Sequence, residues 1–162
     1  MAMKMKVKGL DDLITAMHQL DSDTEKILAS AMYDGAGMLI EAVKAEIQKL
    51  PEDPGYKKTG VERNVVTPDE KKDLLAHVGI ARFAKKNGKI STAIGFDGCS
   101  SHKTRKYPNG VPLPIIARSI ESGSSVRKKY PFLQKAVKAV QTQIEQTIEK
   151  QITEEIQKKV GD

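Results

Sequence analysis

The sequence of 162 residues predicts one α+β domain (1–162), in which a small antiparallel sheet of three or four strands packs against long helices. Three observations lead to this class. Apolar residues recur every three or four positions through two long stretches, one near each end of the chain. Between these stretches, short runs alternate apolar and polar residues and are separated by turn signals. The length allows one domain with a real core, and the aromatic content of 4% makes that core aliphatic.

Two helices are expected in the N-terminal third, at residues 10–20 and 24–50. The first carries apolar residues three or four apart, and the second does so over seven turns before Pro51 ends it. Gly35 and Gly37 interrupt good helix formers in the second helix at some cost in stability. They therefore indicate a bend or a close approach of another element.

Three strands are expected next, at about 62–67, 74–82 and 89–96. The last two alternate apolar and polar residues, so each would bury one face of a meander against the long helices. Asn87-Gly88 lies between them, and this dipeptide is a strong short-range hairpin signal.

A long loop, 97–112, leads to a short helix at 113–121. Loops of this length are usually functional or disordered. The short helix ends before Gly123, which can adopt a positive φ and turn the chain sharply. A second basic loop follows and leads to Pro131, a residue suited to the start of a helix.

The C-terminal helix is expected at 131–160 and would be about 43 Å long, more than the width of a small domain. From Val140 its apolar residues are four apart, and each such step drifts about 40° around the helix. The sequence therefore predicts that the first half packs on the domain and the outer half meets another subunit, through Ile148, Ile152 and Ile156. The alternative is a partly exposed helix with isolated surface isoleucines.

The positive charge is concentrated in the middle of the chain. The whole chain has a net charge of +6, whereas residues 82–130 contain eleven Lys or Arg and two acidic residues, a net +9. Such a field favours nucleic acid or the acidic face of a protein, although a solvated rim is the alternative. Lys103, Arg105 and Lys106 form the candidate basic loop.

The second basic loop supplies further interface candidates, namely Gly123, Arg127, Lys128 and Lys129. Glu121 lies among these cations in the sequence. We expect it to pair with one of them, within the subunit or across an interface, or else to be exposed without a fixed partner.

Signals of catalysis are weak. The sequence contains no Gly-rich phosphate loop and no His-Glu-x-x-His motif, and Cys99 and His102 make only half of a metal site. We therefore expect no enzyme activity, no catalytic residue, no cofactor and no metal. The single Cys fits a reducing compartment, and no run of residues has the length and apolar character of a membrane span or a secretory signal.

Five weak signals occur in a fixed order along nearly the whole chain. A Gly-Leu-Asp-Asp-Leu opener precedes a long Ala-rich helix that ends in Pro, with Thr59-Gly60 after it, and a strand pair follows. Next come Ile-Ala-x-x-Ile-Glu-x-Gly at 116–123 and Pro-Phe-Leu-x-x-Ala at 131–136. This order resembles the neck and tail-completion (head–tail joining) protein family of long-tailed bacteriophages. The chain departs from the pattern at Ile120, where the family has an aromatic residue, and in its longer terminal helix.

The resemblance implies a structural protein of a phage or prophage virion, made in the cytoplasm of the host bacterium. Its copies would form a ring between head and tail, contact other connector and tail proteins, and surround the channel through which DNA passes without sequence-specific binding. The alternative function is that of a small basic nucleic-acid-binding protein that uses the loops within 82–130.

Overall fold

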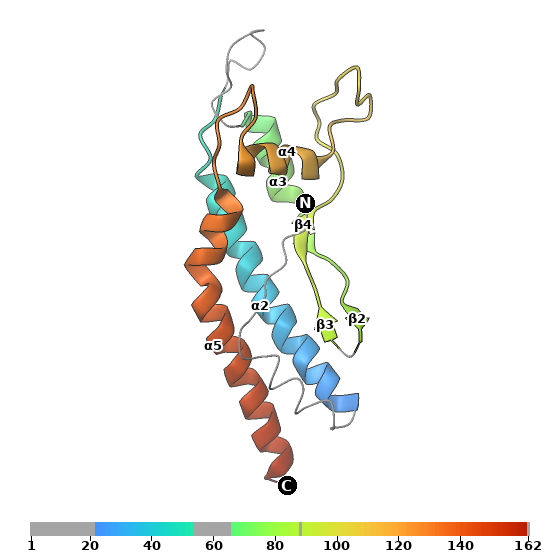
Figure 1. The fold of residues 1–162 in the computed structure, drawn as a ribbon, viewed down its shortest axis with the longest axis vertical. Helices are drawn as coiled ribbons and strands as arrows, with labels where there is room; N and C mark the ends of the chain where they lie inside the picture. Colours follow the sequence, from blue (N-terminus) through green and yellow to red (C-terminus); the bar gives the residue numbers. More distant parts are fainter. Residues whose placement is uncertain (1–21, 54–65, 88, 162) are drawn as a thin grey trace.

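The computed structural model describes residues 22–53, 66–87 and 89–161, and it confirms the α+β class with a long C-terminal helix (Figure 1). The expected helix at 10–20 and most of the expected strand at 62–67 lie outside these residues. The elements in chain order are α2 (Ser22–Gln48), α3 (Pro68–His77), β1 (Val78–Ile80), β2 (Ala84–Lys86), β3 (Lys89–Ser91), β4 (Ile94–Phe96), α4 (Leu113–Ser122) and α5 (Phe132–Val160).

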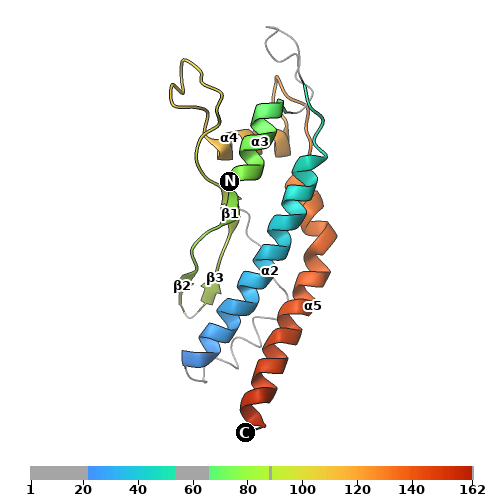
Figure 2. The same ribbon diagram turned by 180° about the vertical axis from the view of Figure 1, so that it is seen from behind.

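The long helices α2 and α5 lie side by side and run in opposite directions along most of the molecule (Figures 1 and 2). Lys159 near the end of α5 pairs with Asp23 at the start of α2 at 3.4 Å, and it lowers the pKa of the Asp23 carboxyl. Midway, a Cβ atom on Gly35 would lie 3.0 Å from side-chain atoms of both Ile144 and Ile148. Gly35 thus allows the close approach that the sequence suggested, while Gly37 has open space around it.

The prediction that the outer half of α5 is exposed for contact with another subunit is wrong, because its isoleucines pack within the domain. Ile148 is 2% exposed, Ile152 is fully buried, and Ile156 packs half-buried against the core. The reason is the length of α2: its 27 residues extend beside most of the 29 residues of α5, so α5 does not project beyond its own domain. The drift of the apolar line still shows at the last turn, where Val160 is 80% exposed.

The expected strand at 74–82 begins only at Val78, because residues 68–77 form helix α3. Thr67 and Glu70 make a capping box: the Glu70 N–H donates to Thr67 Oγ1, and the Thr67 N–H donates to Glu70 Oε2, each at 3.1 Å. This pairing satisfies two N–H groups that a helix start otherwise leaves without partners. Just before this capping box, Val66 forms an isolated parallel β-bridge with Glu52. Within the described residues, this bridge is the part of the expected strand at 62–67 that has strand pairing.

The sheet is smaller than expected, and forms two antiparallel pairs rather than one sheet of three or four strands. The inner pair joins β1 to β4, with Val78 opposite Phe96 and Ile80 opposite Ile94. The outer pair, β2 and β3, closes at Asn87, whose φ of 53° fits the predicted hairpin turn. The expected strand at 89–96 is thus divided at residues 92–93.

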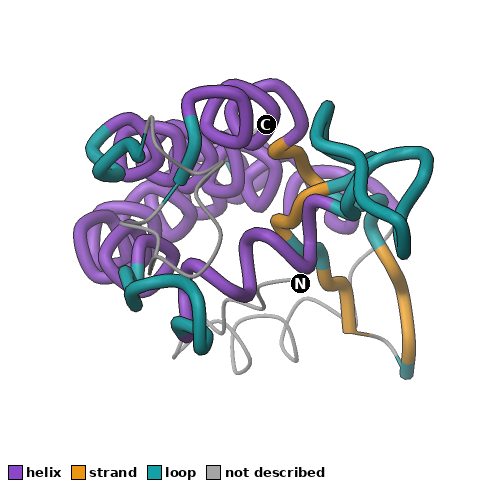
Figure 3. Tube along the Cα trace, turned by 90° about the horizontal axis from the view of Figure 1, so that it is seen from above, coloured by secondary structure: helices purple, strands orange, loops and turns teal. Residues whose placement is uncertain are grey.

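The core lies between the helix pair and the inner strands, and α4 closes one end of it. Phe96 of β4 and Phe132 of α5 meet with ring centroids 6.1 Å apart, and the apolar face of α4 is buried beside them. Viewed along the long axis, the strands lie to one side of the helices (Figure 3). The two loops that flank α4 are therefore displayed at the end of the molecule where α5 begins (Figure 1).

Candidate functional site

The Glu121 carboxylate stabilises the start of α5 and does not lie on an exposed interface. It is 8% exposed, and its two oxygens accept the backbone N–H groups of Leu133 and Gln134 at 2.8 and 3.2 Å. A helix start carries unpaired N–H groups and a partial positive charge, so a carboxylate is favoured there. The expected pairing of Glu121 with a basic side chain is replaced by this helix cap.

Arg127 is also buried, with 6% of its surface exposed, so it is not the exposed cation that the sequence suggested. Its guanidinium binds Glu70 through two parallel hydrogen bonds, Nη2 to Oε1 at 2.9 Å and Nη1 to Oε2 at 3.1 Å. Glu70, which the sequence analysis did not single out, therefore joins the start of α3 to the loop before α5. The Thr-x-x-Glu spacing at 67–70 was the signal that could have revealed it.

Gly123 turns the chain after α4, as the sequence predicted. Its φ is 76°, and a Cβ atom there would lie 3.0 Å from the Cβ of Lys129. The loop it begins is closed by paired backbone hydrogen bonds between Ser124 and Arg127, and the Tyr130 N–H donates to the Ile120 carbonyl at 2.8 Å. This loop is therefore held in place at both ends.

The long loop is organised as an irregular hairpin. Cys99 and Pro112 form an isolated antiparallel β-bridge. The Ser100 N–H donates to the Val111 carbonyl at 2.8 Å, and the Val111 N–H donates to the His102 carbonyl at 3.0 Å. Asp73 of α3 accepts the backbone N–H and the hydroxyl of Ser101 at 2.7 and 2.9 Å. These hydrogen bonds hold the base of the hairpin in a fixed position against α3.

Six exposed cations lie on α4 and its two flanking loops, and we refer to them as the basic end. They are the predicted basic loop (Lys103, Arg105 and Lys106), the interface candidates Lys128 and Lys129, and Arg118 of α4. Within the described ranges, none of the six forms an ion pair. Two large aliphatic residues are exposed among them, Ile115 on α4 (46%) and Val126 in the second loop (58%).

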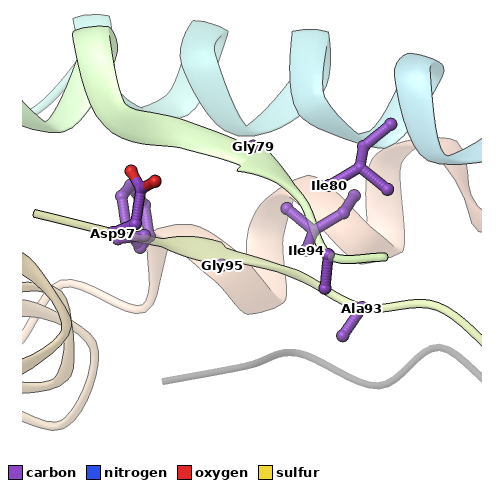
Figure 4. Close-up of a pocket in the computed structure, with 8 residues that line it drawn as sticks. Gly79, Ile80, Ala93, Ile94, Gly95 and Asp97 are labelled. Carbon is purple, nitrogen blue, oxygen red and sulfur yellow. The ribbon is translucent and has the colours of Figure 1, made fainter. Parts of the chain in front are cut away.

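A separate hollow of about 330 Å³ lies along the inner strand pair (Figure 4). Small residues line much of it, including Gly79 and Gly95, which face each other in the register. Among the described residues that line it, Asp97 alone is ionisable, and it lies at the opposite end from Ile80 in Figure 4. These described residues offer mainly apolar contact and form no cluster of reactive groups.

Comparison of the chain with protein-family models, curated proteins and solved structures yields no match. No helix in the described part of the chain is long and apolar enough to cross a membrane. Across the described ranges, no group of three or more His, Cys, Asp or Glu side chains is placed to hold a metal ion.

We predict that Glu121→Ala lowers the free energy of unfolding by about 1–3 kcal/mol, since two N–H groups at the start of α5 lose their acceptor. Glu121→Gln retains an oxygen acceptor and should cost less. Glu149→Ala removes an exposed carboxylate from the same helix and should change stability by no more than about 0.5 kcal/mol. Urea unfolding followed by circular dichroism measures all three, and equal effects of Glu121→Ala and Glu149→Ala would contradict the capping role.

Proposed function

We propose that this protein is a structural subunit of a phage or prophage virion, a neck or tail-completion protein that joins head and tail as a homo-oligomeric ring around the DNA channel. In this role it works by subunit contacts and carries out no chemical step. The ring would contact other connector and tail proteins and let DNA pass without sequence-specific binding. The protein would be made in the host cytoplasm and end in the virion.

One observation carries the proposal. The two most extended motifs behind the family resemblance, at 116–123 and 131–136, meet in one joint: Glu121 of the first caps the helix that begins with the second. Around this joint, Ile116, Ala117, Phe132 and Ala136 are buried. The motif residues thus serve to hold a loop and a helix start in fixed positions, a use that suits an assembly subunit.

The second candidate function is nucleic-acid binding, which the six exposed cations of the basic end favour. Exposed aromatic rings would be needed for base stacking. The two tyrosines of this region are each approached by a lysine: Lys106 Nζ lies 5.4 Å from the centroid of Tyr107, and Lys135 Nζ lies 3.8 Å from that of Tyr130. We therefore expect weak, nonspecific DNA binding that disappears as salt screens the phosphates.

The test of the proposed function is deletion of the gene from the phage or prophage that encodes it. We expect DNA-filled heads and complete tails that remain separate under the electron microscope. Purified protein added to the mixed heads and tails should restore joined particles and infectivity, whereas the Ile152→Glu variant, which should not fold, serves as the negative control. Normally joined particles in the deletion strain would refute the proposal.

A further inference from the structure

The two long helices contain acidic stretches that contrast with the basic end. Helix α2 contains five acidic and two basic residues. Residues 140–157 of α5 contain four acidic residues and one basic residue, so both segments are opposite in charge to the basic end. Each of these two helical segments has a net charge of −3, and we call them together the acidic shaft. The two segments lie side by side.

Two neighbouring carboxylates of the acidic shaft have no cation in contact within the described part of the chain. Glu145 and Glu149 lie one turn apart on α5, and Glu145 accepts a hydrogen bond from the Gln141 side chain at 3.0 Å. Neither residue forms an ion pair with any part of the chain that the structure describes. Most other acids of the shaft do have a neighbouring cation, as in Glu41 with Lys44 and Glu154 with Lys150.

The composition of the basic end indicates a protein partner. Exposed Ile115 and Val126 gain nothing from contact with phosphates, but in a protein interface they would be removed from water. An interface with an apolar centre and a charged rim is the usual anatomy of protein association. The partner must also present negative charge, and the acidic shaft of a second copy does so.

We infer that the basic end of one copy binds the acidic shaft of the next copy of the same chain, with Glu145 and Glu149 facing the cations. The two faces differ, so the contact is heterologous, and its repetition builds a ring or an open filament. This inference rests on the proposed function for the ring and adds the surfaces that form it. The charges orient the subunits and speed their encounter.

Charge reversal on each face tests the contact in the full-length protein. Arg105→Glu with Lys106→Glu reverses the charge at the tip of the long hairpin and lowers the basic end from +6 to +2, and Glu145→Lys with Glu149→Lys reverses the charge at these two positions and changes the shaft from −6 to −2. Each double variant should raise the dissociation constant for self-association at least about tenfold. Sedimentation velocity measures this at about 0.1 M salt, and about 1 M salt should weaken the wild-type assembly because screening shortens the range of the charges.

The decisive step is to mix the two variants. At the substituted positions the first variant then has acids on both faces and the second has cations on both faces, so an alternating arrangement again places opposite charges at these positions in every contact. An equimolar mixture should therefore assemble as the wild type does, although each variant alone does not. Arg82→Glu with Lys86→Glu makes the same change in charge on exposed residues outside both faces, and should leave assembly unchanged.

The inference is overturned if both reversed variants still assemble, if their mixture stays dissociated, or if the wild type remains monomeric and binds DNA through Arg105 and Lys106. These results are distinct from those of the gene deletion. Separate heads and tails together with charge-insensitive assembly would retain the proposed function and reject this contact. Normal particles together with recovery on mixing would retain the contact and reject the virion role.

Discussion

Replacing Ile152 by glutamate is expected to unfold the protein. The Ile152 side chain is fully buried on α5 and belongs to the apolar core, so a carboxylate there would lose its contact with water. A buried polar group without a partner costs several kcal/mol and an isolated charge costs more, which is comparable to the whole stability of a typical domain, about 5–15 kcal/mol. Loss of the helical circular dichroism signal and of a cooperative thermal transition would be the measured result.

Two further variants serve as controls for this prediction. Val160→Glu places the same charge on the same helix where the side chain is 80% exposed, and should change stability by about 0.5 kcal/mol or less. Ile152→Val removes one methylene and should cost about 0.5–1.5 kcal/mol. If Ile152→Glu melts like the wild type and fails only to assemble, the outer half of α5 is a subunit interface, as its length first suggested.

The position of the long helices could be predicted from sequence, but the partner of α5 could not. Periodicity placed helices at 24–50 and 131–160, close to the observed Ser22–Gln48 and Phe132–Val160. Helical length says how far an element reaches and not what lies beside it. Since both helices have nearly equal lengths, each covers the other, and Gly35 marks a place of close approach.

The strand expected at 74–82 shows the limit of pattern reading over short runs. Leu74, Ala76, Val78 and Ile80 alternate as a strand would, yet the first two belong to α3. The local signal of Thr67-Pro68-Asp69-Glu70 fixes a helix start there, and this helix continues until Val78 adopts an extended conformation. Capping residues thus outweighed an alternation shared by only a few side chains.

Burial of the charged residues was the least predictable feature of the candidate site. In sequence, Arg127 is indistinguishable from its neighbours Lys128 and Lys129, which are exposed. Its partner Glu70 is 57 residues away, and only the fold brings the two together. Glu121 is different, because its position twelve residues before Leu133 lies within a recognisable motif, although the motif did not reveal its role as a helix cap.

Arg127→Met is expected to lower the free energy of unfolding by about 3–5 kcal/mol. Arg127 and Glu70 are 6% and 3% exposed, so removing the guanidinium leaves a carboxylate buried with its main cation gone. Lys128→Met, next in the chain but exposed, is the matched control and should change stability by about 0.5 kcal/mol or less. Urea unfolding at one protein concentration measures both variants.

The double variant Glu70→Gln with Arg127→Met should recover most of the loss caused by Arg127→Met. Glutamine at position 70 can still accept the Thr67 N–H and preserve the capping box, and neither charge of the Arg127–Glu70 pair remains in the interior. Replacing both members of a buried ion pair is often nearly neutral, whereas removing one is strongly destabilising. A double-mutant cycle that includes Glu70→Gln alone gives the coupling free energy. If Arg127→Met costs no more than Lys128→Met, or if the double variant is as unstable as Arg127→Met, then the ion pair does not fix the second loop against α3.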